Sequence, residues 1–90
     1  MIHSPFTPYP VLFEDTDLLV IHKPEGVLSH PNPGGKGPAA AFEGAYDLND
    51  RRFQTPQGPV WLIHRLDQDT SGILLAAKNK KTVQACRKAF

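Results

Sequence analysis

Two apolar runs, residues 61–63 and 73–77, enclose a polar segment over residues 64–72. Short apolar runs bounded by polar residues and glycine are typical of buried β-strands. A rigid strand on each side holds a reactive side chain in place better than a free loop does. The enclosed segment carries Arg65 and Asp67 directly after the first run. This arrangement predicts a strand–loop–strand unit that presents a carboxylate.

Polar side chains that can hold this loop by local hydrogen bonds follow the carboxylate: Asp69, Thr70 and Ser71. Each residue of the loop also has a structural interpretation. His64 fits a hydrogen-bonded structural histidine as well as a functional one. Arg65 and Asp67 fit an ion pair within the loop as well as a reactive pair. The residue types alone leave both interpretations open.

The first third of the chain predicts a β-hairpin. Residues 11–15 and 18–23 form two strand-like runs joined by turn-forming residues, and the second run is apolar enough to suggest burial on both faces. Residues 23–26, with the sequence Lys-Pro-Glu-Gly, are typical of a tight turn. The preceding residues 1–10 contain three prolines, which we expect to leave that segment extended and without regular structure.

Residues 31–59 are rich in glycine and proline and lose the apolar periodicity, which predicts a long loop or insertion. A short helix over residues 38–43 is possible there, with Pro38 in its first turn. Residues 79–90 predict a helix that begins with Asn79 as its N-cap. Its expected apolar face consists of Val83, Cys86, Ala89 and Phe90.

The overall charge of +1 and the content of 21% charged and 40% hydrophobic residues exclude a strongly disordered or highly basic chain. Positive charges gather near the C-terminus: Lys78, Lys80, Lys81, Arg87 and Lys88. They suit a face that binds a nucleic-acid backbone, or a solvated helix surface. The single cysteine, with no leader-like N-terminus and no apolar run of membrane-spanning length, favours a cytoplasmic protein that is not in the membrane.

Several tempting motifs fail on their spacing. Residues 34–37 look like a phosphate-binding loop, but His30 and Gly37 stand where that motif needs Gly and Ser or Thr. Residues 69–72 resemble an aspartic-protease loop with Ser and Gly exchanged, which weakens a protease half-site as an alternative. The histidines and Cys86 show no zinc-ligand spacing, so we expect them to bind no metal.

The segment His64-Arg65-Leu66-Asp67-x-x-Thr70-Ser71-Gly72 resembles the H-R-L-D-x-x-T-S-G signature of the RluA-type pseudouridine synthases at every defined position. A second block is similar to the family's opening segment. It consists of Glu14-Asp15, then Leu18-Leu19-Val20-Ile21-x-Lys23-Pro24-x-Gly26, with His30-Pro31 beyond. Two blocks in the family's order make a chance match improbable.

The resemblance implies an enzyme that isomerises uridine in ribosomal or transfer RNA to pseudouridine, without a cofactor and as a monomer. Asp67 would be the catalytic aspartate, and Arg65 would enter the space left by the flipped base. The remaining expected RNA-binding residues are His64, Thr70, Ser71, Gly72, Lys78, Lys80 and Lys81. The implied fold is α+β, with a mixed, mostly antiparallel sheet and flanking helices.

The same resemblance implies a tyrosine and a basic residue further along the catalytic domain. Neither Tyr9 nor Tyr46 matches that tyrosine. Residues 1–90 are therefore expected to be the N-terminal portion of a single catalytic domain, with 31–59 as its long loop. The alternative is an RNA-binding fragment that catalyses nothing.

Overall fold

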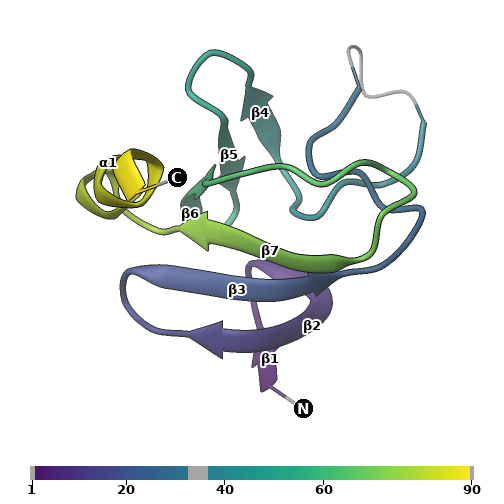
Figure 1. The fold of residues 1–90 in the computed structure, drawn as a ribbon, viewed down its shortest axis with the longest axis horizontal. Helices are drawn as coiled ribbons and strands as arrows, with labels where there is room; N and C mark the ends of the chain where they lie inside the picture. The colour runs from purple at the N-terminus through teal and green to yellow at the C-terminus, as the bar shows by residue number, and fades with distance from the viewer. Residues whose placement is uncertain (1, 33–36, 90) are drawn as a thin grey trace.

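The computed structural model of the chain describes residues 2–32 and 37–89. Within them a seven-stranded sheet runs in the order β1-β2-β3-β7-β6-β5-β4, and every neighbouring pair is antiparallel (Figure 1). The elements are β1 (Ile2–Ser4), β2 (Thr7–Glu14), β3 (Leu18–Lys23), β4 (Ala45–Asp47), β5 (Arg52–Thr55), β6 (Gly58–Leu62), β7 (Gly72–Ala77) and α1 (Lys80–Ala89).

The antiparallel sheet agrees with the expected architecture, but two details of the expectation are wrong. The described strands form no mixed sheet, since the parallel pairing found is an isolated bridge between Leu28 and Ala40. The described part of the chain also contains one helix, α1, rather than several flanking helices. The helix lies at one end of the sheet, beside β6 and β7 (Figure 1).

The predicted β2–β3 hairpin is confirmed, and the Asp15 carboxylate closes its turn by accepting hydrogen bonds from the backbone of Asp17 and Leu18. The expectation for residues 1–10 is wrong, because Pro8 and Pro10 lie within β2. They fall in the stretch where the β1–β2 register shifts. A proline cannot donate to the ladder, so it is tolerated in a strand where regular pairing is interrupted.

The prediction that β3 is buried on both faces is also wrong. Its buried side chains alternate, with Leu19, Ile21 and Lys23 on one face and the exposed His22 on the other. Leu18 and Val20 share the His22 face and are half-buried. An antiparallel sheet with one face in the core explains this period of two.

The segment 31–59 is not one long loop. It contains β4, β5 and the beginning of β6, while residues 38–43 form irregular structure instead of the expected short helix. These strands were hard to recognise because they are short and separated by glycine and proline. Within β5, Phe53 and Thr55 are buried and Gln54 is exposed, which is the alternation of a strand in a one-sided sheet.

The core has two parts, one on each face of the sheet. The larger includes Leu19, Ile21, Phe53, Val60, Leu62 and Leu74, and the loop residue Phe42 covers it. The smaller lies beneath α1 and joins Trp61, Ile63 and Ala77 to Val83.

The predicted helix α1 is confirmed, and the Asn79 side chain caps it by accepting a 2.8 Å hydrogen bond from the backbone of Thr82. Its apolar face is shorter than expected, because Ala89 is exposed; Phe90 lies outside the described residues. A step of three residues turns the helix by about 300°, which is about 60° less than a full turn. Two such steps lead from Val83 to Ala89, so Ala89 points about 120° away from Val83.

Candidate functional site

The loop that carries Asp67 leaves β6 and returns through β7, as the two apolar runs predicted. The two strands pair through Trp61 with Ala77 and Leu62 with Ala76, and the Ile63 amide still bonds the Leu75 carbonyl. One residue later the ladder ends. The His64 Nε2 atom accepts a 3.1 Å hydrogen bond from the Leu75 amide in place of a backbone carbonyl. His64 therefore has a structural bond at the point where the loop separates from the sheet.

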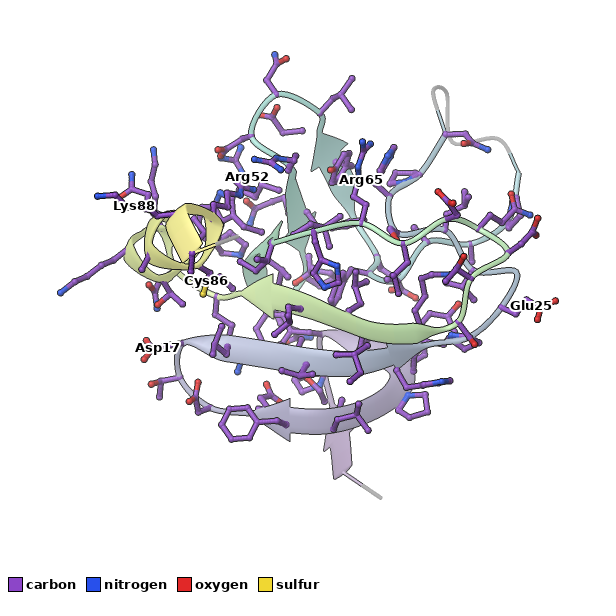
Figure 2. The ribbon with its side chains drawn as sticks, viewed as in Figure 1. Asp17, Glu25, Arg52, Arg65, Cys86 and Lys88 are labelled. Carbon is purple, nitrogen blue, oxygen red and sulfur yellow. The ribbon has the colours of Figure 1, made fainter. Side chains whose placement is uncertain are left out.

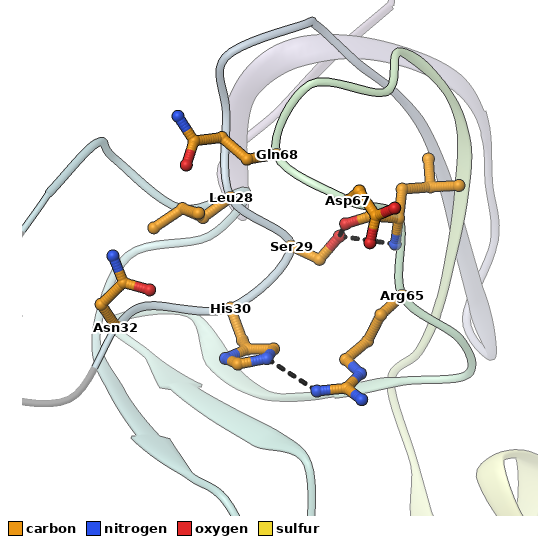
Figure 3. Close-up of a pocket in the computed structure, with 8 residues that line it drawn as sticks. Leu28, Ser29, His30, Asn32, Arg65, Asp67 and Gln68 are labelled. Carbon is orange, nitrogen blue, oxygen red and sulfur yellow. Dashed lines mark hydrogen bonds between the residues drawn. The ribbon is translucent and has the colours of Figure 1, made fainter.

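Ser29 fastens this loop to the segment that follows β3. Its side chain is 4% exposed, and its hydroxyl donates a 2.7 Å hydrogen bond to the Leu66 carbonyl while accepting one of 2.8 Å from the Leu66 amide. Both polar backbone groups of the residue before Asp67 are thus held by one side chain (Figure 3). These two hydrogen bonds fix the backbone from which the Asp67 carboxylate projects.

Replacing Ser29 with alanine is expected to lower the free energy of unfolding by about 1–3 kcal/mol, because the partly buried Leu66 backbone groups lose their partners. Ser71→Ala makes the same chemical change at an exposed position of the same loop, and it should cost less than about 0.5 kcal/mol. Denaturant titration of both variants measures the difference. Equal stability of the two would contradict the anchoring role of Ser29.

Lys23 is a second anchor and is fully buried, with 0% of its surface exposed. Its ammonium group donates to the backbone carbonyls of Pro24 at 3.1 Å, Val27 at 2.5 Å and Gln68 at 3.3 Å. An ammonium group has three protons, so these three carbonyls match its donors in number. The Gly26 amide adds a 2.8 Å bond to the Gln68 carbonyl. The turn after β3 and the Asp67 loop are therefore joined around one buried cation.

We expect Lys23→Met to lower the free energy of unfolding by about 2 kcal/mol. Methionine fills the same space, but the buried carbonyls of two segments lose a charged donor. Lys80→Met removes the same charge from the exposed start of α1 and should change stability little. Hydrogen exchange adds a local test, since protection of the Gly26 amide should fall in the Lys23 variant alone. Unchanged protection there would argue against the bridge.

A pocket of about 420 Å³ opens beside the loop. Leu28, Ser29, His30 and Asn32 of the segment after β3 form one side, and Arg65, Leu66, Asp67 and Gln68 of the loop form the other (Figure 3). The Asp67 carboxylate is exposed, with no hydrogen bond or ion pair to any residue within 2–32 or 37–89. The site thus combines a fixed backbone with an unengaged acid.

Arg65 does not form the ion pair with Asp67 that was one alternative for this loop. Its Nη1 atom lies 2.9 Å from Nε2 of His30, whose other ring nitrogen, Nδ1, lies 3.1 Å from the Pro31 carbonyl. If Nδ1 carries the proton and donates to that carbonyl, Nε2 is free to accept from Arg65. The His30 ring stacks on Tyr46 at 5.2 Å with 9° between the planes. Arg65 is thereby held at the edge of the pocket.

The side chains of Thr70 and Ser71 contribute less to the loop than expected. Asp67 and Thr70 are joined by a 3.0 Å backbone hydrogen bond, and the side chains of Thr70 and Ser71 are exposed. Gly72 starts β7 opposite Lys23 with a φ of 151°, a backbone conformation that favours glycine. The loop is held mainly by Ser29 and Lys23, which come from another part of the chain.

The three lysines predicted to contact RNA lie beyond the other end of β7. The length of β7, six residues, separates Gly72 from Lys78, which corresponds to roughly 20 Å. The Lys78 ammonium pairs with Glu14 at 2.5 Å and donates to the Asp15 carbonyl at 2.7 Å. Lys80 and Lys81 are exposed at the start of α1. The structure therefore does not bring these lysines to the Asp67 pocket.

Sequence reasoning missed Ser29, His30 and Tyr46 as parts of the site. His30 had a signal, because it stands in the second matching block, and Lys23 had one as a charged residue closing an apolar strand.

The glycine-rich motif at 34–36 lies outside the described residues. Within 2–32 and 37–89 no three acidic, histidine or cysteine side chains gather as metal ligands, and no helix there has the length and apolarity of a membrane span.

Comparison with known proteins adds independent information. The profile of a family described as RNA pseudouridylate synthase matches residues 17–90, from just before β3 through α1. An uncharacterized RNA pseudouridine synthase of Mycoplasma genitalium is 44% identical over 73 residues, which cover 81% of this chain and 21% of that protein. The dual-specificity RNA pseudouridine synthase RluA of Vibrio vulnificus is 36% identical over 80 residues, 89% of this chain and 29% of that protein.

The ribosomal large subunit pseudouridine synthase C of Pasteurella multocida is 43% identical over 77 residues, which cover 83% of this chain and 21% of that protein. The matched part thus spans 21–29% of the length of these three relatives.

Proposed function

Since the chain belongs to the RNA pseudouridylate synthase family and to its RluA type, we propose that it carries the catalytic aspartate, Asp67, of an enzyme that isomerises uridine in RNA. The observation that supports this most is the exposed, unpaired Asp67 carboxylate on a loop anchored by Ser29 and Lys23. Productive chemistry requires such a fixed backbone beneath the reacting group.

The chemistry needs a carboxylate beside the glycosidic bond of uridine. The bond between the uracil nitrogen and the ribose breaks, the uracil turns, and its carbon 5 is joined to the ribose. Asp67 can act as a nucleophile that forms a covalent intermediate, which divides one difficult step into two easier ones. It can instead stabilise positive charge on the ribose or remove a sugar proton. Each role requires the ionised acid at the pocket.

Arg65 is proposed to hold the RNA open. A uridine in a folded RNA reaches Asp67 only after leaving its stack, at a cost of a few kcal/mol. The Arg65 side chain lies on the exposed side of the loop and is bonded to His30 rather than to a carboxylate. Moving from His30 to RNA groups breaks one exposed hydrogen bond and no ion pair among the described residues. Its planar guanidinium then suits both base and phosphate contacts.

The proposed substrate is ribosomal or transfer RNA, and the proposed setting is a monomeric cytoplasmic enzyme without a cofactor. The relatives include a ribosomal large subunit pseudouridine synthase and a dual-specificity RNA pseudouridine synthase. Deleting the gene and mapping pseudouridine in total ribosomal and transfer RNA tests the proposal. We expect at least one uridine to lose its modification in the deletion strain. An unchanged map at every position would contradict an enzymatic role.

The alternative is that these ninety residues bind RNA and catalyse nothing. Tyr46 supports it, because this ring stacks on His30, its hydroxyl is buried, and it does not line the Asp67 pocket. The family's pocket tyrosine therefore has no counterpart there. Incubating the purified chain with unmodified transcripts separates the two functions. Pseudouridine formed by the chain would overturn the alternative.

A further inference from the structure

Three arginines near the Asp67 pocket have no carboxylate partner among the described residues: Arg51, Arg65 and Arg87. The neighbouring acids, Asp47 and Asp50, both pair with Arg52, at 3.5 Å and 2.6 Å. Asp67 adds a third carboxylate at the pocket, so four guanidinium groups stand against three carboxylates, which leaves one positive charge in excess. Figure 2 shows Arg52 and Arg65 on either side of strands β4 and β5.

Arg51 and Arg87 meet at the end of β6, where the Asp67 loop begins. The Leu62 amide donates a 2.9 Å bond to the Arg51 carbonyl, and the Leu62 carbonyl accepts one of 2.9 Å from Nη2 of Arg87. Arg87 also donates to the Asp50 carbonyl at 3.2 Å. The acceptors of these hydrogen bonds are neutral, and the Asp50 carboxylate acts on the Arg87 charge through space without a direct ion pair among the described residues. Arg51 has a φ of 53° in the turn before β5, and its side chain is exposed.

The groups around Tyr46 are rich in hydrogen-bond donors and poor in acceptors. The Tyr46 hydroxyl and Nε of Arg87 are buried and have no hydrogen-bond partner in the described part of the chain. Burial raises the pKa of the Tyr46 hydroxyl, and the positive charges of Arg65, Arg51 and Arg87 act in the opposite direction. All three guanidinium groups are therefore close enough to act on one tyrosine. Among these groups, the exposed guanidinium groups of Arg51 and Arg65 are the ones that an anion can reach.

We propose that Arg51 and Arg87 bind the phosphodiester backbone of RNA beside the uridine that Arg65 displaces. This inference rests on the proposed function, since it takes the RNA at the Asp67 pocket as the ligand. Guanidinium groups bind phosphate oxygens through parallel hydrogen bonds, which suits Arg better than Lys for this contact. The exposed Arg51 side chain has its donors available for such a contact. Arg87 has only Nη1 left for a phosphate, because its Nη2 bonds two carbonyls and its Nε is buried. Leu62, whose backbone bonds both Arg51 and Arg87, lies three residues before Arg65 in the chain.

The salt dependence of RNA binding measures phosphate contacts directly. A short labelled single-stranded RNA containing uridine is titrated with the ninety-residue chain between about 50 and 200 mM salt. Losing one phosphate contact lowers the slope of log K against log salt by about 0.7. We expect that decrease for Arg51→Gln, whose side chain makes no hydrogen bond among the described residues. Arg87→Gln should show the same decrease, provided that its circular dichroism and melting remain those of a folded chain.

Lys88→Gln is the matched control. It removes one positive charge from the position next to Arg87, on the side of α1 away from Arg65 (Figure 2), and the slope should stay that of the wild type. A variant with glutamine at both Lys80 and Lys81 tests the rival surface on α1. The inference is overturned if Arg51→Gln keeps the wild-type slope, if only the double lysine variant flattens it, or if the chain does not bind the RNA.

The pseudouridine map keeps this test separate from that of the proposed function. An unchanged slope in Arg51→Gln, with modification still lost on gene deletion, overturns the phosphate site and leaves the enzyme. A flattened slope with an unchanged map supports the phosphate site and overturns the enzyme.

Discussion

Replacing Asp67 with alanine in the chromosomal gene is expected to abolish pseudouridine at the sites that depend on this protein. Among the described residues that line the pocket, Asp67 supplies the only carboxylate, so the loss in rate should be on the order of 10³-fold or more. Mapping pseudouridine in cellular RNA measures the effect on the protein in its natural form. The Asp67 side chain makes no contact that the fold needs, so the variant should remain stable.

Asp69→Ala is the matched control for this experiment. Asp69 lies in the same loop, is exposed and carries the same charge, but it does not line the pocket. We expect the pseudouridine map of this variant to equal that of the wild type. Equal maps for Asp67→Ala and the wild type would remove Asp67 from the chemistry. Loss of modification in both variants would show that the loop's total charge matters, rather than one acid.

Gly44→Ala is expected to cause the largest loss of stability, about 3–4 kcal/mol. Gly44 precedes β4 with a φ of 111°, a conformation that side chains rarely adopt. A Cβ atom there would overlap the carbonyl oxygen of Gln54 and lie 2.8 Å from its carbonyl carbon. The backbone of Gln54 cannot move aside as a flexible side chain can. The loss is a large fraction of the stability of a small domain.

Gly58→Ala separates the steric effect from the backbone strain. Gly58 has a φ of 128°, yet a Cβ atom there would meet nothing within 4 Å. Its substitution should therefore cost only the strain, about 1–2 kcal/mol. Thermal or denaturant unfolding of both variants gives the difference. If Gly44→Ala were no worse than Gly58→Ala, the close approach of the segment before β4 to β5 would not limit stability.

The strands with long apolar runs and clear turns were predictable from the sequence. The β2–β3 hairpin, the strand–loop–strand unit around Asp67 and the helix capped by Asn79 each carry a local pattern that needs no distant partner. The strands β4 and β5 were missed because their place in the sheet depends on pairing with each other and, for β5, with β6. With only three and four residues, they are too short for periodicity to identify.

The residues of the candidate site were likewise predictable only in part. Asp67 and Arg65 were found because they stand together in one segment between two strands. The residues that support them were not, because Ser29 lies 37 positions from Leu66, and Lys23 lies 45 from Gln68. Contacts over such distances in the chain leave no periodic trace in a single sequence. Lysines 78, 80 and 81 were grouped by charge, which contains no information about the side of the sheet they reach.

The family, the proposed catalytic carboxylate and the strands that flank it followed from the amino-acid sequence alone, because these depend on residue types at fixed short spacings. What holds that carboxylate in place is visible only in the folded chain. Pairing of β3 with β7 brings the turn after Lys23 against the Asp67 loop, and the β4–β5 hairpin brings Tyr46 under His30 and Arg51 toward Arg87. Those neighbours are set by strand order, which local residue preferences do not encode.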